Sequence, residues 1–167
     1  VLKVEPPGGE FLRRRDARSG AFVPFAMLNA CKSSVSLNLK SDRGRKLFLQ
    51  MVEDADIVAE NYAPGVIDRL GIGFDTLRAA NPKIILASIS GYGQFGPVAH
   101  RPGFDQIMQG MGGLMSVTGF PGQPPTRAGL AVADSSAGLY AALGIFAALL
   151  ERETSGKGQW VHASLLH

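Results

Sequence analysis

The sequence is poor in the features that mark secreted, membrane-bound or nucleic-acid-binding proteins. It has one cysteine, Cys31, so no disulfide can form within the chain, which fits a reducing compartment. No segment reaches the ~18 unbroken apolar residues of a membrane span, since the longest apolar run, 139–150, is too short. A net charge of +3 is too mild to indicate nucleic-acid binding. We therefore expect a cytoplasmic protein with no membrane or nucleic-acid partner.

Motifs of several common enzyme classes are missing as well. The sequence contains neither a Walker loop nor a G-x-S-x-G nucleophile elbow. Its three histidines, His100, His162 and His167, have no metal-ligating residue at a suitable spacing, so we expect no metal site. His162 lies in a strand-like pattern and is expected to be structural. Cys31 has no nearby histidine, which favours a small core residue over a nucleophile.

One glycine-rich segment, 91–96, matches the G-x-G-x-x-G pattern of dinucleotide-binding folds and follows a strand-like run. In those folds the third glycine leads into a helix. Here Pro97, and then Pro102 and Gly103, interrupt the chain directly after it. We therefore reject a nicotinamide-dinucleotide site, and expect these glycines to let the backbone approach a ligand or another segment closely.

Strand-like and helix-like patterns alternate along the chain. Apolar and polar residues alternate over 34–39, which is typical of a half-buried strand. Further strands are predicted at 56–60, 83–90 and 159–166, and helices after Ser41 and at 66–70, 74–81 and 105–115. Such alternation predicts an α/β fold with a parallel sheet covered by helices. Ligands bind at the carboxyl ends of strands in these sheets, which directs attention to 61–65, 91–103 and Asp134.

A single carboxylate, Asp134, stands in front of the apolar run 139–150. A helix that is apolar on nearly every side is buried in a core or an interface. Asp134 is then either a plain N-cap or a carboxylate screened from water that acts as a nucleophile. The local sequence leaves both roles open. Asp105, which follows a Pro-Gly-Phe segment, is the second candidate and fits equally well as an N-cap.

Four stretches, at 29–40, 55–71, 89–105 and 132–159, share the motifs of one family, among them Glu-Asn-Tyr-Ala-Pro-Gly at 60–65. With them, essentially the whole chain resembles the class III coenzyme A transferases, also called the CaiB/BaiF family. The resemblance implies a Rossmann-like parallel sheet covered by helices, in an incomplete large domain. On this basis 1–167 is a single partial α/β domain, and the family's N-terminal start, second domain and C-terminal part are absent.

Members of this family move coenzyme A between carboxylic acids, and the catalytic aspartate of the family falls at Asp134. The resemblance implies that Asp134 attacks an acyl-CoA thioester to form a mixed anhydride, which CoA thiolate then converts into an aspartyl-CoA thioester. N–H groups of the first helical turn would stabilise the oxyanion. The implied substrates are an acyl-CoA and a carboxylic acid acceptor, with no permanently bound cofactor. Asp105, Gln109 and the loop 91–96 are candidates to border the acyl site.

Full-length members resemble interlocked dimers in which each chain threads through the other's ring. The resemblance therefore implies a homodimer for the full-length protein. The sequence begins and ends within strand-like patterns, so we expect a fragment with little or no activity alone.

The CoA-binding positions of related enzymes also map onto this sequence. Lys40 and Arg69 suit phosphate groups, and Tyr62 suits the adenine or the pantetheine arm. The leucines of the set fit equally well as core residues. The complete set is Leu37, Lys40, Asn61, Tyr62, Arg69 and Leu70.

The sequence departs from the family where cations are expected near the nucleotide. Pro6 follows Glu5, where the family often has an arginine, and Ser33 follows Lys32, where the family usually has Lys-Arg-Ser. Elsewhere, a basic cluster at 13–18 either meets phosphate or forms a solvated surface.

Two alternatives belong to other functional classes. The α-methylacyl-CoA racemases of the same family have a histidine immediately before the upstream aspartate, where this chain has Phe104. A phenyl ring cannot shuttle a proton, which favours a transferase. The other alternative is a non-catalytic CoA-binding or dimerisation module, against which Asp134 and its small neighbours argue.

Overall fold

The computed structural model describes residues 1–14 and 23–166, and the chain divides into two compact units, Val1–Gln50 and Met51–His167. The first unit contains a parallel pair of strands, β1 (Leu2–Glu5) and β2 (Ser33–Ser36). Its helical elements are η1 (Phe11–Arg14), α1 (Val23–Leu28) and the first part of α2 (Asp42–Glu53). The predicted strand 34–39 ends early, because the carbonyl of Asn38 accepts the N–H of Ser41 and starts a turn.

A charged cluster around Glu5 holds the first unit together. Glu5 is only 3% exposed, and its two carboxylate oxygens accept hydrogen bonds from Nε and Nη2 of Arg13, each at 2.7 Å. The Ser34 hydroxyl donates to the same carboxylate at 2.6 Å. The bonds from Arg13, followed by that from Ser34, hold the pKa of Glu5 well below its usual range. Arg13 is therefore occupied by an ion pair, while residues 15–18 of the basic cluster lie outside the described residues.

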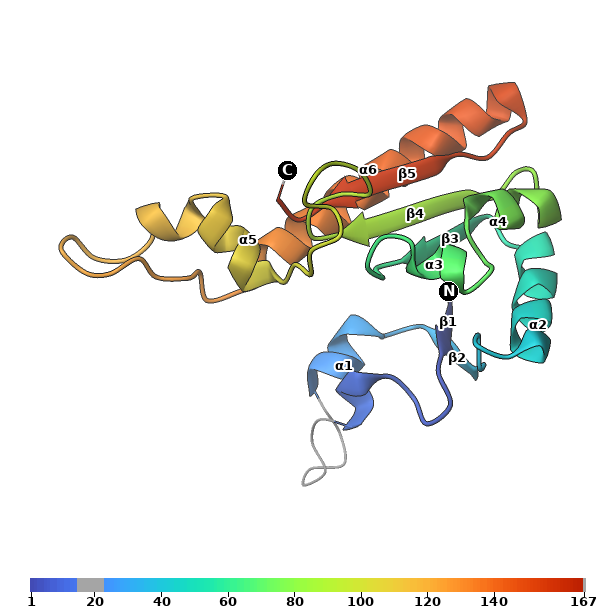
Figure 1. The fold of residues 1–167 in the computed structure, drawn as a ribbon, viewed down its shortest axis with the longest axis horizontal. Helices are drawn as coiled ribbons and strands as arrows, with labels where there is room; N and C mark the ends of the chain where they lie inside the picture. The colour runs from blue at the N-terminus through green and yellow to red at the C-terminus, as the bar shows by residue number, and fades with distance from the viewer. Residues whose placement is uncertain (15–22, 167) are drawn as a thin grey trace. The chain divides into compact units, whose positions relative to one another are not determined.

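The second unit is built on a three-stranded parallel sheet (Figure 1). Its strands are β3 (Ile57–Glu60), β4 (Ile85–Ser90) and β5 (Trp160–Ser164), with β4 in the middle. Residues 85–87 are at most 1% exposed, as expected for the central strand of a parallel sheet that is covered on both faces. The predicted α/β class is confirmed.

The helices of the second unit follow the predicted pattern with one difference. They are α3 (Val66–Arg69), α4 (Phe74–Ala80), α5 (Asp105–Met111), η2 (Leu114–Val117) and α6 (Val132–Ser155). The helix predicted over 105–115 stops at Met111, because Gly113 adopts a positive φ of 82° that a continuous α-helix cannot contain.

The glycine-rich loop after β4 makes a close approach between two backbone segments. A Cβ on Gly91 would lie 2.7 Å from the Cα of Gly103, so neither position has room for a side chain. No helix follows Gly96 until α5 begins at Asp105. Both the rejection of a dinucleotide motif and the expected close approach agree with this geometry.

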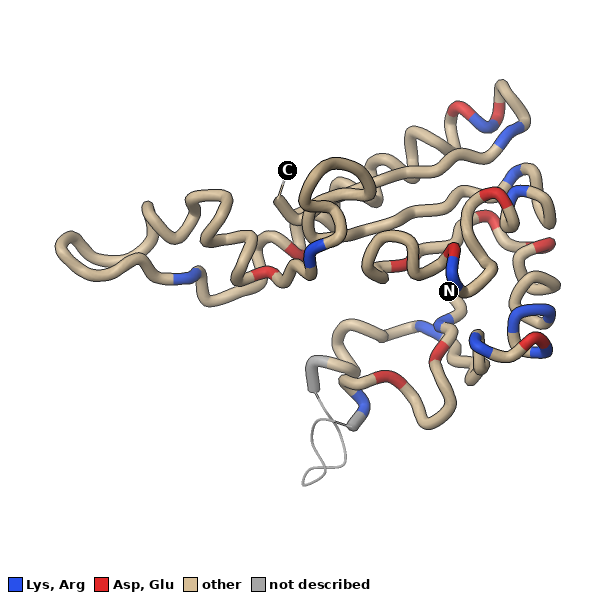
Figure 2. Tube along the Cα trace, in the orientation of Figure 1, with Lys and Arg blue, Asp and Glu red and all other residues tan. Residues whose placement is uncertain are grey.

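Helix α6 packs on β4 and β5, and its fully buried residues are all small. Ala137, Ala141 and Ala148 are buried, and a Cβ on Gly144 would lie 2.6 Å from Cγ1 of Val161. The opposite face is exposed and apolar, and Figure 2 shows no charge along the middle of this helix. The exposed large side chains are Leu139, Tyr140, Leu143, Phe146 and Leu150. Burial of the whole helix in a core is therefore wrong for this chain.

One further expectation is corrected by the structure. Cys31 is exposed, in a turn with φ of 61°, and not a core residue.

Helix α6 is long and apolar enough, by length and composition alone, to cross a membrane, although the core helix of a globular domain passes the same test. The absence of a membrane partner thus stays a prediction.

The contact between α6 and the sheet can be tested with two glycines of the same helix. Gly144→Ala should lower the free energy of unfolding by about 1–3 kcal/mol, because the stiff side chain of Val161 must move. Gly138→Ala should raise it by about 1 kcal/mol through helix propensity, because a Cβ there meets nothing within 4 Å. Urea unfolding followed by the fluorescence of Trp160 measures both, and equal effects would contradict the packing.

Candidate active site

Asp134 lies in the first turn of α6, as its third residue. The N-cap is Ala131, so the structure excludes the N-cap role for Asp134 itself. The backbone N–H groups of Ala133 and Asp134 instead donate to Oδ1 of Asp105, at 2.8 and 3.2 Å. Asp105 therefore caps α6 from the start of a different helix, α5, whose own N-cap is Phe104.

Gln109 extends this cap into a buried polar cluster. Its Nε2 donates to Oδ2 of Asp105 at 2.6 Å and to the carbonyl of Leu130 at 3.2 Å. Its Oε1 accepts the N–H of Ala128 at 2.8 Å. Gln109 is 2% exposed and holds the segment that leads into α6, and its place at the border of an acyl site stays a prediction.

The carboxylate of Asp134 is exposed, which corrects the expectation of a carboxylate kept away from water. Partial burial, and then the negative charge of Asp105, still raise the pKa of Asp134. A carboxylate with a raised pKa is a stronger base and a better nucleophile. The nearby N–H groups are already used, since those of Ala133 and Asp134 donate to Asp105 and that of Val132 donates to Leu130. They cannot also bind an oxyanion, so that expectation is wrong.

Most of the predicted CoA-binding residues lie on the β3–α3 turn. Asn61 and Tyr62 follow the carboxyl end of β3, and both are exposed. Arg69 ends α3, and its Nη1 would lie 3.2 Å from a Cβ on Gly65, so the guanidinium lies beside the turn. Leu70 is half-buried. This turn presents a cation, an amide and an aromatic ring to solvent.

Leu37 and Lys40 belong to the first unit, between β2 and α2. The N–H of Leu37 donates to the carbonyl of Glu5 at 2.9 Å, and its side chain is half-buried. Lys40 is exposed and its N–H donates to Oδ1 of Asn38 at 3.1 Å. The ammonium group of Lys40 is thus available to a phosphate, while Leu37, like Leu70, is neither a full core residue nor fully exposed.

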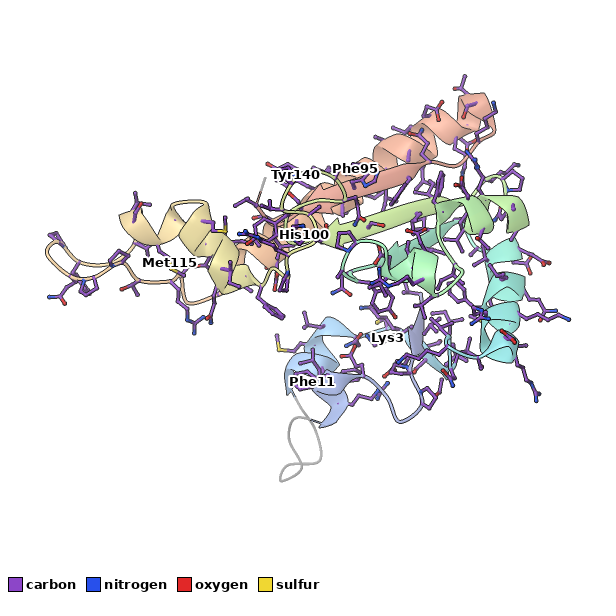
Figure 3. The ribbon with its side chains drawn as sticks, in the orientation of Figure 1. Lys3, Phe11, Phe95, His100, Met115 and Tyr140 are labelled. Atoms are coloured by element: carbon purple, nitrogen blue, oxygen red, sulfur yellow. The ribbon has the colours of Figure 1, made fainter. Side chains whose placement is uncertain are left out.

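A separate pocket of about 500 Å³ lies beside β5. The ring of His162 lies 4.4 Å from that of Trp160, and burial lowers the pKa of His162. Figure 3 labels Phe95 and Tyr140, two of the aromatic side chains of this pocket. Asp134 is not among its lining residues, which are Tyr92, Gly93, Gln94, Phe95, Tyr140, His162, Ala163 and Ser164.

Comparison with known proteins decides the family. Residues 1–167 match the family model described as CoA-transferase family III. The chain belongs to CoA-transferase family III. It is 45% identical to an acetyl-CoA:oxalate CoA-transferase of Acetobacter aceti, over 99% of this chain and 43% of that protein. It is 40% identical to a formyl-CoA:oxalate CoA-transferase of Streptomyces avermitilis, over 100% of this chain and 41% of that protein.

A solved structure of the same family agrees with this fold. The crystal structure of a CAIB/BAIF family protein from Brucella suis matches with a TM-score of 0.90 at 38% identity, over 99% of this chain and 46% of that one. The chain thus spans less than half the length of the relatives it matches.

Sequence reasoning missed two polar arrangements of this family member. The pairing of Gln109 with Asp105 has a local signal, since the two residues stand four apart on a helix whose neighbouring residues are apolar. The position of Ser88 beside Glu60 has no such signal, because the two residues lie on different strands. Among residues 1–14 and 23–166, no group of three or more His, Cys, Asp or Glu side chains is arranged to hold a metal ion.

The charge of Asp105 can be tested through the titration of Asp134. Asp105→Asn keeps an oxygen that can cap α6 but removes the negative charge, so the pKa of Asp134 should fall. The side-chain carboxyl carbon of Asp134 reports this pKa in an NMR titration. Asp75→Asn, at a carboxylate that is 89% exposed on α4, is the matched control and should leave the pKa unchanged. An unchanged or higher pKa in Asp105→Asn would rule out the electrostatic coupling.

Proposed function

We propose that the whole protein transfers coenzyme A from an acyl-CoA to a carboxylic acid acceptor, with Asp134 as the nucleophile. The observation that carries this proposal is a carboxylate of raised pKa in the first turn of α6, where Asp105 holds the backbone and Ala133 and Ser135 flank Asp134. The small neighbours leave space for a thioester. Membership of CoA-transferase family III and the named activities of the relatives support the same reaction.

The proposed reaction proceeds through acyl transfers at one carboxylate. An oxygen of Asp134 attacks the thioester carbonyl, the C–S bond breaks, and CoA leaves as thiolate, giving a mixed anhydride. The thiolate then attacks the aspartyl carbonyl and releases the donor acid. The acceptor carboxylate attacks the resulting aspartyl-CoA thioester to form a second anhydride, and the thiolate attacks the acceptor's acyl carbonyl. The new acyl-CoA leaves and the carboxylate of Asp134 is restored.

Coenzyme A would contact the exposed groups of the predicted set. Lys40 and Arg69 supply positive charge for its phosphates, and Tyr62 supplies an aromatic face that is 44% exposed. The contacts of Asn61, Leu37 and Leu70 would be with the remainder of the molecule. No permanently bound cofactor takes part in this scheme.

The exposure of Asp134 implies that other parts of the whole protein enclose the site. A mixed anhydride needs protection from water, and oxyanion donors must come from outside the first turn of α6, whose N–H groups are occupied. We propose that the part of the polypeptide beyond this chain, in a cytoplasmic homodimer of interlocked chains, supplies both. The exposed apolar face of α6 supports such a cover.

A racemase role is less well supported by the site. Phe104, at the position that carries a histidine in racemases, is 70% exposed and has no titratable nitrogen. In heavy water, a chiral 2-methylacyl-CoA should therefore gain no α-deuterium with the full-length protein. Deuterium incorporation would overturn the transferase proposal.

The nucleophile is tested by substitution in the full-length protein. Asp134→Ala should lower CoA transfer by roughly 10³-fold or more, since removal of a covalent nucleophile leaves only background catalysis. Wild-type protein incubated with a panel of acyl-CoAs and hydroxylamine should yield a modified Asp134 detectable by mass. Glu153→Ala, at an exposed carboxylate near the other end of α6, is the control and should keep full activity. Transfer at the wild-type rate in Asp134→Ala would show that the nucleophile is another residue.

A further inference from the structure

A buried serine stands in the middle of the three-stranded sheet with a polar partner from each neighbouring strand. Ser88 of β4 is 1% exposed, and the sheet register places it opposite Glu60 of β3. From β5, Nε1 of Trp160 donates to Oγ of Ser88 at 2.9 Å. The Ser88 hydroxyl therefore stands beside the carboxylate of Glu60 and favours its charged form. A row of polar side chains therefore crosses the whole sheet, from β5 to β3.

The row continues into the turn that carries the candidate CoA-binding residues. Oε2 of Glu60 accepts the backbone N–H of Tyr62 at 2.7 Å, a short distance typical of a hydrogen bond to a charged group. The carboxylate thus closes the backbone around Asn61, directly after β3 ends. The conformation of this turn depends on where the Glu60 side chain is held.

The far end of the row is anchored by aromatic packing. The ring of Trp160 stacks on that of Phe74 with centroids 5.9 Å apart. The ring centroid of His162 lies 4.4 Å from that of Trp160. These contacts fix the direction of the indole N–H. A buried hydroxyl is costly unless it is hydrogen-bonded, so the bond from Trp160 stabilises Ser88 in the sheet.

We propose that Glu60 is a positioning residue for coenzyme A. Its carboxylate fixes the Asn61–Tyr62 turn, and the neighbouring Ser88, which Trp160 holds, orders that carboxylate. The inference rests on the proposed function, because only that proposal makes Asn61 and Tyr62 residues that bind coenzyme A. Its physical basis is preorganisation, since a turn that is already ordered loses less conformational entropy when the ligand binds. Glu60 acts through Tyr62 and touches no reacting atom.

Two serines of the same strand and the same sheet face give a matched test. Ser88→Ala breaks the row, whereas Ser90→Ala removes the hydroxyl of a buried residue, 6% exposed, that accepts from Nε2 of Gln94 at 3.4 Å. In the full-length protein, Ser88→Ala should raise the Kd for CoA, measured by calorimetry, roughly 5-fold. The KM for acyl-CoA should rise with it while kcat changes little. Ser90→Ala should leave both constants unchanged, and equal effects of the two substitutions would overturn the proposal.

A second pair of variants separates positioning from folding. Glu60→Ala should raise the Kd for CoA about 10-fold, because the N–H of Tyr62 loses a charged acceptor. Glu60→Gln retains an acceptor oxygen for that N–H and should restore the Kd to within about 3-fold of wild type. If Glu60→Gln is as weak as Glu60→Ala, or if neither changes the Kd, the positioning role is wrong.

Control variants distinguish this inference from the proposed function. Tyr62→Ala and Arg69→Ala should each weaken CoA binding if the β3–α3 turn is the binding site. No loss in either variant would refute the proposed CoA site itself. Loss in those two variants, with unchanged binding in Ser88→Ala and Glu60→Ala, would refute only the role of the row.

Discussion

The carboxylate of Asp105 is the constraint on which the candidate active site depends. It accepts the N–H groups of Ala133 and Asp134, so a side chain of α5 caps the first turn of α6. Gln109 fixes that carboxylate and also binds the backbone leading to the helix. Because these groups are buried, water cannot replace them, and the position of Asp134 follows that of α5. Partial burial, and then the same negative charge, raise the pKa of Asp134, which links the geometry of the nucleophile to its reactivity.

Helix α6 joins this site to the sheet by a face of small residues. Ala137, Ala141 and Gly144 allow its backbone close to β5, so the start of the helix is held by the same packing that forms the core. Its other face exposes Leu139, Leu143 and other large apolar groups at helical spacing. A helix with one face on a sheet and the other uncovered fits a chain that spans less than half the length of its relatives.

The parallel sheet also organises the turn that follows β3. Glu60 and Ser88 are opposite one another only because β3 and β4 run in the same direction in this register. Trp160 reaches Ser88 from the third strand, so a turn that is far from β5 in sequence depends on a side chain of that strand. The row of polar side chains across the sheet therefore connects the aromatic residues at β5 to the turn at Tyr62.

The α/β class, most helix and strand positions and the family follow from the sequence alone, because periodicity, turn residues and motif spacing are local properties of the chain. The sequence also selected Asp134 and Asp105 as the carboxylates to examine. Tertiary packing then settled that Asp105 caps α6, that α6 is half uncovered, that Cys31 is exposed and that Glu60 stands beside Ser88. Each of these depends on which distant segment lies next to a given side chain, and the register and packing that bring the two together are written in no single stretch of sequence.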